Sequence, residues 1–222
     1  MLPASQVASS CAIQVPDEWV GAARLTFRSG EEIYAQDENA DMIYRLVRGA
    51  VRTSHLQADG RRQIGDFYYE GDVIGVETGP THRFSAEALG DCEVLAMRRS
   101  GSAAYEADRL ERLIWQATAA ELLRAQSHML LLGRATACEK VARFLLDIAE
   151  RFKDESVALP MSRQDMADYL GLTIETISRM LGRLQAAGMV EFSGTRRYRI
   201  RRPGALAELA AACRPSVEER DP

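Results

Sequence analysis

Apolar residues recur every three or four positions across residues 162–187, and this period is typical of helices that bury one face. The first stripe comprises Met166, Ala167 and Leu170. The second comprises Ile174, Ile177, Leu181 and Leu184. Ser162 and Thr173 precede the stripes as helix caps, and Gly171 supplies a turn between them. The pattern predicts two short helices joined by a tight turn, a helix-turn-helix.

Strand-like sequence follows the second helix. Gly188 is a suitable helix stop, and the runs 189–192 and 196–200 flank a Ser-Gly-Thr turn at 193–195. A hairpin in this position predicts the wing of a winged helix. Upstream, residues 137–152 are expected to form a helix that opens the same domain. Its core stripe is Val141, Phe144, Leu145 and Ile148.

The first half of the chain has a different pattern, because glycines cut residues 20–99 into short pieces. These glycines are Gly30, Gly49, Gly60, Gly65, Gly71, Gly75, Gly79 and Gly90. Strand-like runs lie between them, such as 42–47, 50–56 and 92–97. Many short strands separated by turns predict an all-β sandwich or barrel.

A proline-free stretch at about 108–136 joins the two halves and is predicted to be one long helix. Residues spaced alternately by three and four form a heptad seam along it. They are Trp115, Thr118, Leu122, Ala125, Met129 and Leu132. The seam is a candidate dimer interface, and the alternative is that it packs on the β domain. The neighbouring Leu123, Leu130 and Leu131 are expected to pack there.

Charge is distributed unevenly along the chain. The whole sequence has a formal net charge of −4, whereas residues 162–202 carry eight arginines against four carboxylates. A positive segment on an acidic protein is typical of a phosphate-binding surface. No stretch of about 18 uncharged apolar residues predicts a membrane span, and no leader is evident, so we expect a cytoplasmic protein. No catalytic motif, phosphate loop or metal-ligand spacing suggests an enzyme.

The polar face of the second helix has the chemistry of DNA base recognition. Glu175, Ser178 and Arg179 share one stripe at i, i+3 and i+4. Arg179 can donate to O6 and N7 of guanine, Glu175 can accept from an exocyclic amine, and Ser178 can do either. The alternative is an ordinary solvated face in which Glu175 pairs with Arg179. The positive surroundings favour the DNA interpretation.

Backbone phosphates are expected to contact hydroxyls at the helix starts and arginines nearby. The predicted phosphate contacts are Ser162, Thr173, Thr176, Arg183, Arg196 and Arg197, with Arg199, Arg201 and Arg202 also in or just after the wing.

The run from Ser162 to Leu181, SRQDMADYLGLTIETISRML, closely resembles the DNA-binding element of the CRP/FNR superfamily of bacterial transcription regulators, in its FNR and FixK branch. The resemblance extends over about residues 20–202. It implies that Glu175, Ser178 and Arg179 read the half-site of a TTGAT-N4-ATCAA palindrome. It also implies a cyclic-nucleotide-binding jelly roll, whose Gly-Asp-x-x-Gly turn matches Gly71 to Gly75. A palindrome requires a two-fold protein with recognition helices about 34 Å apart, which favours the dimer seam.

The residues that hold effectors in this family are not matched. Cyclic-nucleotide binders have Glu after the second glycine and Arg before a Ser-Ala pair, but this chain has Val76 and Phe84 there. Glu77 and Arg83 lie one position away, so a shifted alignment is the alternative. Family members that sense through an iron-sulfur cluster hold it with four cysteines, three of them clustered near the N-terminus. The four cysteines and three histidines are dispersed: Cys11, Cys92, Cys138, Cys213, His55, His82 and His128.

We therefore expect Cys92 and Cys138 to be small buried hydrophobes, Cys11 or Cys213 to be the candidates for a regulatory thiol, and no cofactor. Haem or a small molecule bound by the β roll remains the alternative. The predicted fold is α+β: a flexible tail at 1–18, a β roll at 19–107, a dimerisation helix at 108–136, a winged helix at 137–202, and a helix and tail at 203–222. The expected partners are palindromic double-stranded DNA, RNA polymerase and a second copy of the chain, with no membrane.

Overall fold

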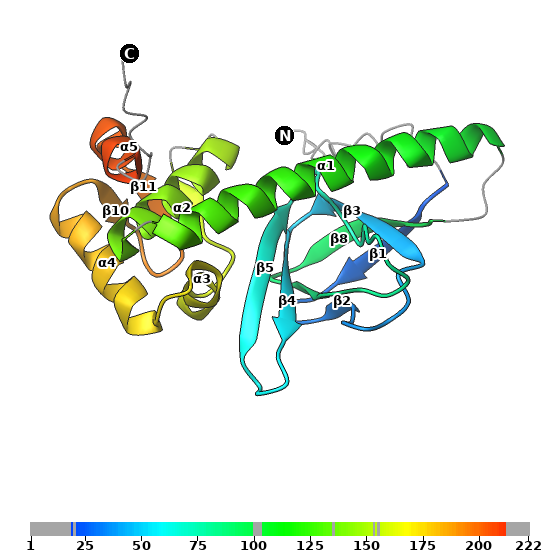
Figure 1. Cartoon of the computed structure of the whole chain (residues 1–222). Coiled ribbons are helices and arrows are strands. Elements are labelled where there is room, and N and C mark those ends of the chain that lie inside the picture. Colours follow the sequence, from blue (N-terminus) through cyan, green and yellow to red (C-terminus); the bar gives the residue numbers. More distant parts are fainter. Residues whose placement is uncertain are drawn as a thin grey trace, which may run out of the picture.

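The protein is described by a computed structural model that covers residues 19, 21–99, 104–134, 136–152, 154 and 156–211. A β roll lies beneath one long helix, and a smaller mixed domain lies at the C-terminal end of that helix (Figure 1). The predicted tails at 1–18 and after residue 211, with Cys11 and Cys213, fall outside the described residues. The predicted α+β class, with an N-terminal roll and a C-terminal winged helix, is confirmed.

Two antiparallel four-stranded sheets form the roll. One has the order β1-β8-β3-β6, from β1 (Ala23–Phe27), β8 (Cys92–Arg98), β3 (Met42–Arg48) and β6 (Val73–Ile74). The other has the order β2-β7-β4-β5, from β2 (Glu32–Tyr34), β7 (Ser85–Ala88), β4 (Ala50–Leu56) and β5 (Arg62–Tyr69). The inward side chains of both sheets form one apolar core that includes Leu46, Val51, Ala86 and Val94.

Glycine is required where β3 turns into β4. Gly49 has a φ of 96°, and a Cβ there would lie 2.6 Å from Cys92 Sγ and 2.7 Å from the carbonyl oxygen of Asp91. Cys92 is itself buried and donates to the carbonyl of Ala50, as expected for a structural cysteine. Cys138 is only half-buried at the start of the next domain.

The long helix α1 (Ala104–Arg134) crosses the roll with one face against it. Leu110, Leu113 and Ile114 pack on the roll with Trp19 and Ile43. The prediction that Leu123 and Leu130 also pack there is wrong, since they are 65% and 62% exposed. Leu131 is half-buried against a cluster that joins Phe67 and Tyr69 of the roll to the core of the C-terminal domain.

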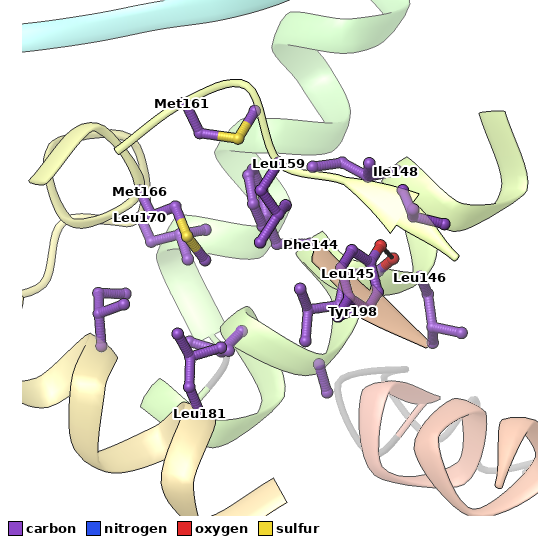
Figure 2. Packing of buried hydrophobic residues seen from close by; sticks show 14 of the residues in the cluster. Phe144, Leu145, Leu146, Ile148, Leu159, Met161, Met166, Leu170, Leu181 and Tyr198 are labelled. Atoms are coloured by element: carbon purple, nitrogen blue, oxygen red, sulfur yellow. Dashed lines mark hydrogen bonds between the residues drawn. The ribbon is translucent and has the colours of Figure 1, made fainter. Parts of the chain in front are cut away.

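The C-terminal domain packs four helices and a small sheet around one core (Figure 2). Its elements are α2 (Ala137–Phe152), β9 (Val157–Ala158), α3 (Arg163–Leu170), α4 (Ile174–Ala186), β10 (Val190–Phe192), β11 (Arg197–Ile200) and α5 (Pro203–Ala211). The predicted α2 stripe is buried, as are Met166, Leu170 and Leu181. Ile174 does not belong to the buried face of α4, because it starts the helix beyond the core and is 38% exposed. Met180 is buried in the core instead.

Candidate nucleic-acid interface

Caps fix the start of both short helices. Ser162 is the N-cap of α3 in a capping box: its hydroxyl accepts from the N–H of Asp165, and the Asp165 carboxylate accepts from the N–H of Ser162. Gly171 ends α3 with the left-handed φ of 62°, and Thr173 caps α4 by accepting from the N–H of Thr176. These local signals place α4 immediately after a tight turn.

The helix α4 presents the predicted recognition stripe to solvent. Glu175 and Arg179 are exposed and Ser178 is half-exposed, while Ile177 and Leu181 on the opposite face are buried. The pKa of Glu175 is lowered by hydrogen bonds from its own backbone N–H and from the Thr173 side chain. Its carboxylate is therefore an acceptor at neutral pH. No ion pair joins Glu175 to Arg179 among the described residues, so neither group is held by the other.

Arg163 is a further candidate that the sequence pattern did not single out. It is exposed at the first position of α3, and its Nη1 donates to Ser178 Oγ over 3.3 Å. The contact joins two helices, so no spacing within either helix could have revealed it. Arg163 also lines a hollow of about 270 Å³ between α3 and the wing, together with Thr195 and Arg196. The guanidinium groups of Arg163 and Arg196 therefore border the face of the helix-turn-helix that carries Ser178.

Some of the residues predicted to contact phosphates already use their hydrogen-bond donors within the protein. Ser162 donates both its N–H and its hydroxyl to Asp165 Oδ2, at 2.9 and 2.7 Å, so this residue serves the capping box. Thr173 likewise uses its hydroxyl in capping, at 3.3 Å from the N–H and 3.2 Å from the hydroxyl of Thr176. The backbone N–H of Thr176 is thereby engaged as well.

The arginines around the wing fall into two groups. Arg183 and Arg196 are exposed, and their side chains make no hydrogen bond or ion pair within the described part of the chain. Arg197 donates to the carbonyl of Ser156 at 3.0 Å, and Arg201 pairs with Glu191 at 2.5 Å. The guanidinium donors of Arg183 and Arg196 are therefore available to a ligand without breaking a contact within the described residues.

Comparisons with known proteins agree with this geometry. A family model described as the Crp-like helix-turn-helix domain matches residues 139–209, and one described as the cyclic nucleotide-binding domain matches residues 24–104. The chain is 44% identical over 191 residues to the nitrogen fixation regulation protein FixK of Azorhizobium caulinodans, which covers 82% of this chain and 77% of FixK.

A second relative is the transcriptional activatory protein AadR of Rhodopseudomonas palustris, 39% identical over 176 residues, or 76% of this chain and 74% of AadR. The solved structure of FixK2 from Bradyrhizobium japonicum superposes with a TM-score of 0.80 at 48% identity, covering 85% of this chain and 96% of that one. The chain belongs to the CRP/FNR family of transcription regulators. It is a FixK-like member whose helix-turn-helix is a DNA-binding element, and it is not an enzyme.

The roll of this CRP/FNR regulator encloses a cavity of about 670 Å³ between its strands and α1. Phe84, the residue before Ser85 and Ala86, lines this cavity beside Arg83. Its ring lies against Gly65, where an added Cβ would be 2.9 Å from ring Cε1. The carboxylates of Asp66, Glu77 and Glu121 line the cavity, against the guanidinium groups of Arg83 and Arg124. An excess of carboxylates does not suit a buried phosphate.

Glu77 and Arg83, the residues that a shifted alignment would assign to nucleotide binding, contact each other in the structure. Glu77 accepts from the backbone N–H of Arg83 at 3.1 Å and lies 3.8 Å from His82 Nδ1. His82 is buried and stacks on Tyr34, while His128 stacks on Tyr169 and contacts its carbonyl at 2.7 Å. The described residues contain no group of three His, Cys, Asp or Glu that could hold a metal ion. None of the described helices has both the length and the apolar composition needed to cross a bilayer.

We expect the stability of Asp66→Asn relative to wild type to rise between about pH 4 and pH 6. Burial raises the pKa of Asp66 to about 6, although hydrogen bonding by Phe67 and the charge of Arg124 oppose the shift. In the unfolded chain the pKa is about 3.9. Between these values the folded protein retains a proton that the unfolded chain has lost. The contribution of Asp66 to the wild-type free energy of unfolding therefore falls as pH rises, by at most about 1.4 kcal/mol per pH unit.

Urea unfolding of both proteins at one concentration, from pH 4 to pH 7, measures this difference. The amide introduced by Asp66→Asn cannot titrate, so the variant lacks this contribution to the pH dependence. The free energy of unfolding of the variant minus that of wild type should rise up to about pH 6 and then stay constant. A gap that does not change with pH would show that Asp66 ionises normally.

Proposed function

We propose that the protein is a homodimeric, sequence-specific transcription activator that binds a TTGAT-N4-ATCAA-like palindrome and recruits RNA polymerase without a bound effector. The observation that carries the proposal is the exposed stripe Glu175, Ser178 and Arg179 on a helix whose other face is buried. This stripe combines an acceptor, a hydroxyl and a bidentate donor, the set that distinguishes base pairs in the major groove.

A second copy of the chain would cover the apolar seam of α1. Trp115, Leu122 and Met129 are 71%, 58% and 65% exposed, and Thr118 and Ala125 lie between them on the same seam. A row of large apolar side chains is costly in water and is typical of an interface. Leu132, at the end of the seam, is half-buried and lies beside Gly171 in the α3–α4 turn. The end of the seam thus contacts the helix-turn-helix of the same protomer.

Activity without an effector is supported by the roll cavity. Phe84 stands before the Ser-Ala pair, where the resemblance implies an arginine in cyclic-nucleotide binders, and the lining carboxylates outnumber the guanidinium groups. We infer that the roll serves as a scaffold for α1 and the DNA-binding domain. The names of the relatives, a nitrogen fixation regulation protein and a transcriptional activatory protein, support a role as an activator in nitrogen-related metabolism. The resemblance to the FixK branch further implies low-oxygen metabolism, and we infer that the protein acts in the cytoplasm.

Selection of bound duplexes from random DNA tests the proposal. The purified protein, with no added ligand, should enrich a palindrome with a TTGAT-like half-site and a fixed central spacer. Addition of cyclic AMP or cyclic GMP should leave both the enriched site and its affinity unchanged. Enrichment of unrelated or non-palindromic DNA, or a strict need for a nucleotide, would contradict the proposed function.

A further inference from the structure

Two arginines of the β roll reach the helix-turn-helix. Arg52 on β4 donates from Nη1 to Asp165 Oδ1 at 2.6 Å, and Arg62 on β5 donates from Nη2 to the same oxygen at 2.8 Å. Arg62 also pairs with Asp168 Oδ2, at 2.8 Å from Nη2 and 3.2 Å from Nε. These contacts join segments more than 100 residues apart in the chain. Figure 1 shows α3 lying beside β5.

Asp165 is the shared acceptor of this cluster and also belongs to the cap of α3. Its Oδ2 accepts from the N–H and hydroxyl of Ser162, while its Oδ1 accepts from the two arginines. The side chain is 2% exposed. Burial acts to raise the pKa of Asp165, but the hydrogen bonds from Ser162 and the charges of Arg52 and Arg62 outweigh it and lower the pKa. The carboxylate of Asp165 is therefore ionised. Its hydrogen bonds to Ser162, Arg52 and Arg62 form together only when α3 has one orientation on the roll.

The arginines are themselves held in place. Arg52 donates from Nη2 to Glu87 Oε1 on the neighbouring strand β7 at 2.7 Å, and only 14% of its side chain is exposed. A buried ion pair is weak evidence for stability, because desolvation offsets most of the attraction. Planar guanidinium groups with several fixed partners do, however, impose a defined direction on the groups they bind. This cluster is therefore suited to orienting α3 on the roll.

A second contact to the roll lies at the other end of α3. Tyr169 packs against Phe67 of β5, with ring centroids 5.2 Å apart, and Phe67 also contacts Phe144 of α2. Two separated points on one helix define its orientation, whereas one point leaves it free to rotate. Since Met166 and Leu170 of α3 share a core with Ile177 and Leu181 of α4, the orientation of α3 determines that of the recognition helix.

We propose that Arg52 and Arg62 are positioning residues for DNA recognition, which lock the helix-turn-helix against the β roll and so set the separation of the two recognition helices. This inference rests on the proposed function, because it requires a dimer on a palindrome. Loss of both arginines removes one of the two contacts that orient α3 on the roll and leaves the base-reading stripe unaltered.

The test measures how strongly the full-length protein discriminates between palindromes with central spacers of three, four, five and six base pairs. In the doubly substituted Arg52→Met, Arg62→Met protein, preference for the best spacer should fall by about tenfold, equivalent to about 1.4 kcal/mol. The penalty for replacing the guanine of each half-site should remain, because Arg179 is unchanged. Arg61→Met is the matched control: it removes a positive charge from the same hairpin, and its partner Asp59 lies in that hairpin.

Asp168→Asn is a milder variant that removes one partner of Arg62 and leaves the Asp165 cap intact. It should lower the spacer preference in the same direction, which keeps the test decisive if the double variant does not fold. Equal loss of affinity on every spacer, with the preference unchanged in folded variants, would overturn the proposal. If the wild-type protein showed no spacer preference, the proposed binding to a palindrome would be wrong. The proposed positioning role of Arg52 and Arg62 would then be wrong as well.

Discussion

Leu122→Glu is expected to convert the protein to a monomer and to abolish tight binding to the palindrome. Leu122 is at the centre of the exposed α1 seam, between Trp115 and Met129. In the proposed dimer each copy buries its Leu122, and burial of a leucine contributes about 1.5 to 3 kcal/mol. The substitution removes that contribution twice and places two carboxylates in one apolar interface. Sedimentation velocity measures the mass, and titration of the palindrome measures the affinity.

Gln116→Glu is the matched control, because it adds the same charge at an exposed position of α1 outside the seam. It should remain a dimer and bind DNA normally. A Leu122→Glu protein that is still dimeric, with unchanged affinity, would show that the α1 seam is not the interface.

Arg179→Ala is expected to lose about 1 to 3 kcal/mol of binding free energy for each half-site of the palindrome, roughly 5- to 150-fold in affinity per half-site. Arg179 is exposed on α4, and its side chain makes no ion pair or hydrogen bond within the described residues, so two of its donors are free for guanine O6 and N7. The loss should be confined to sites that carry the half-site guanine. Competition binding against duplexes with each alternative base at that position measures it.

Arg183→Ala provides the comparison, since Arg183 is an exposed arginine one turn later on the same helix. As a phosphate contact it should weaken binding to all sequences alike and reduce the slope of the salt dependence by about one unit for each half-site. If Arg179→Ala behaved in this way too, its side chain would be a phosphate contact and the base-reading assignment would be wrong.

Periodicity revealed most of the DNA-binding domain because its helices are short, capped and buried on one side. Ser162, Gly171 and Thr173 carry local signals that depend only on their neighbours in the chain. The roll strands were predicted where alternation and glycine turns coincide, as at β4 (Ala50–Leu56). The two-residue strand β9 (Val157–Ala158) is too short to produce a pattern.

Tertiary contacts account for the errors and omissions. Ile174 follows the period of α4 but lies beyond the core, and Leu123 and Leu130 follow the apolar character of α1 but are exposed. Periodicity states which residues share a face and does not state which neighbour covers it. Pairings such as Arg52 with Asp165 have no sequence signal, because they depend on how two domains dock. Such pairings carry the proposed positioning of the recognition helix.

A thermodynamic cycle between the protein and the DNA tests base reading by α4 most directly. Wild-type and Arg179→Ala proteins are each titrated with the palindrome and with a duplex in which 7-deazaguanine replaces the half-site guanine. The cycle isolates the interaction of Arg179 with guanine N7 from effects of either change alone. We predict a coupling free energy of about 1 kcal/mol or more. A coupling indistinguishable from zero, in a protein that still binds the palindrome, would contradict recognition of that guanine by Arg179.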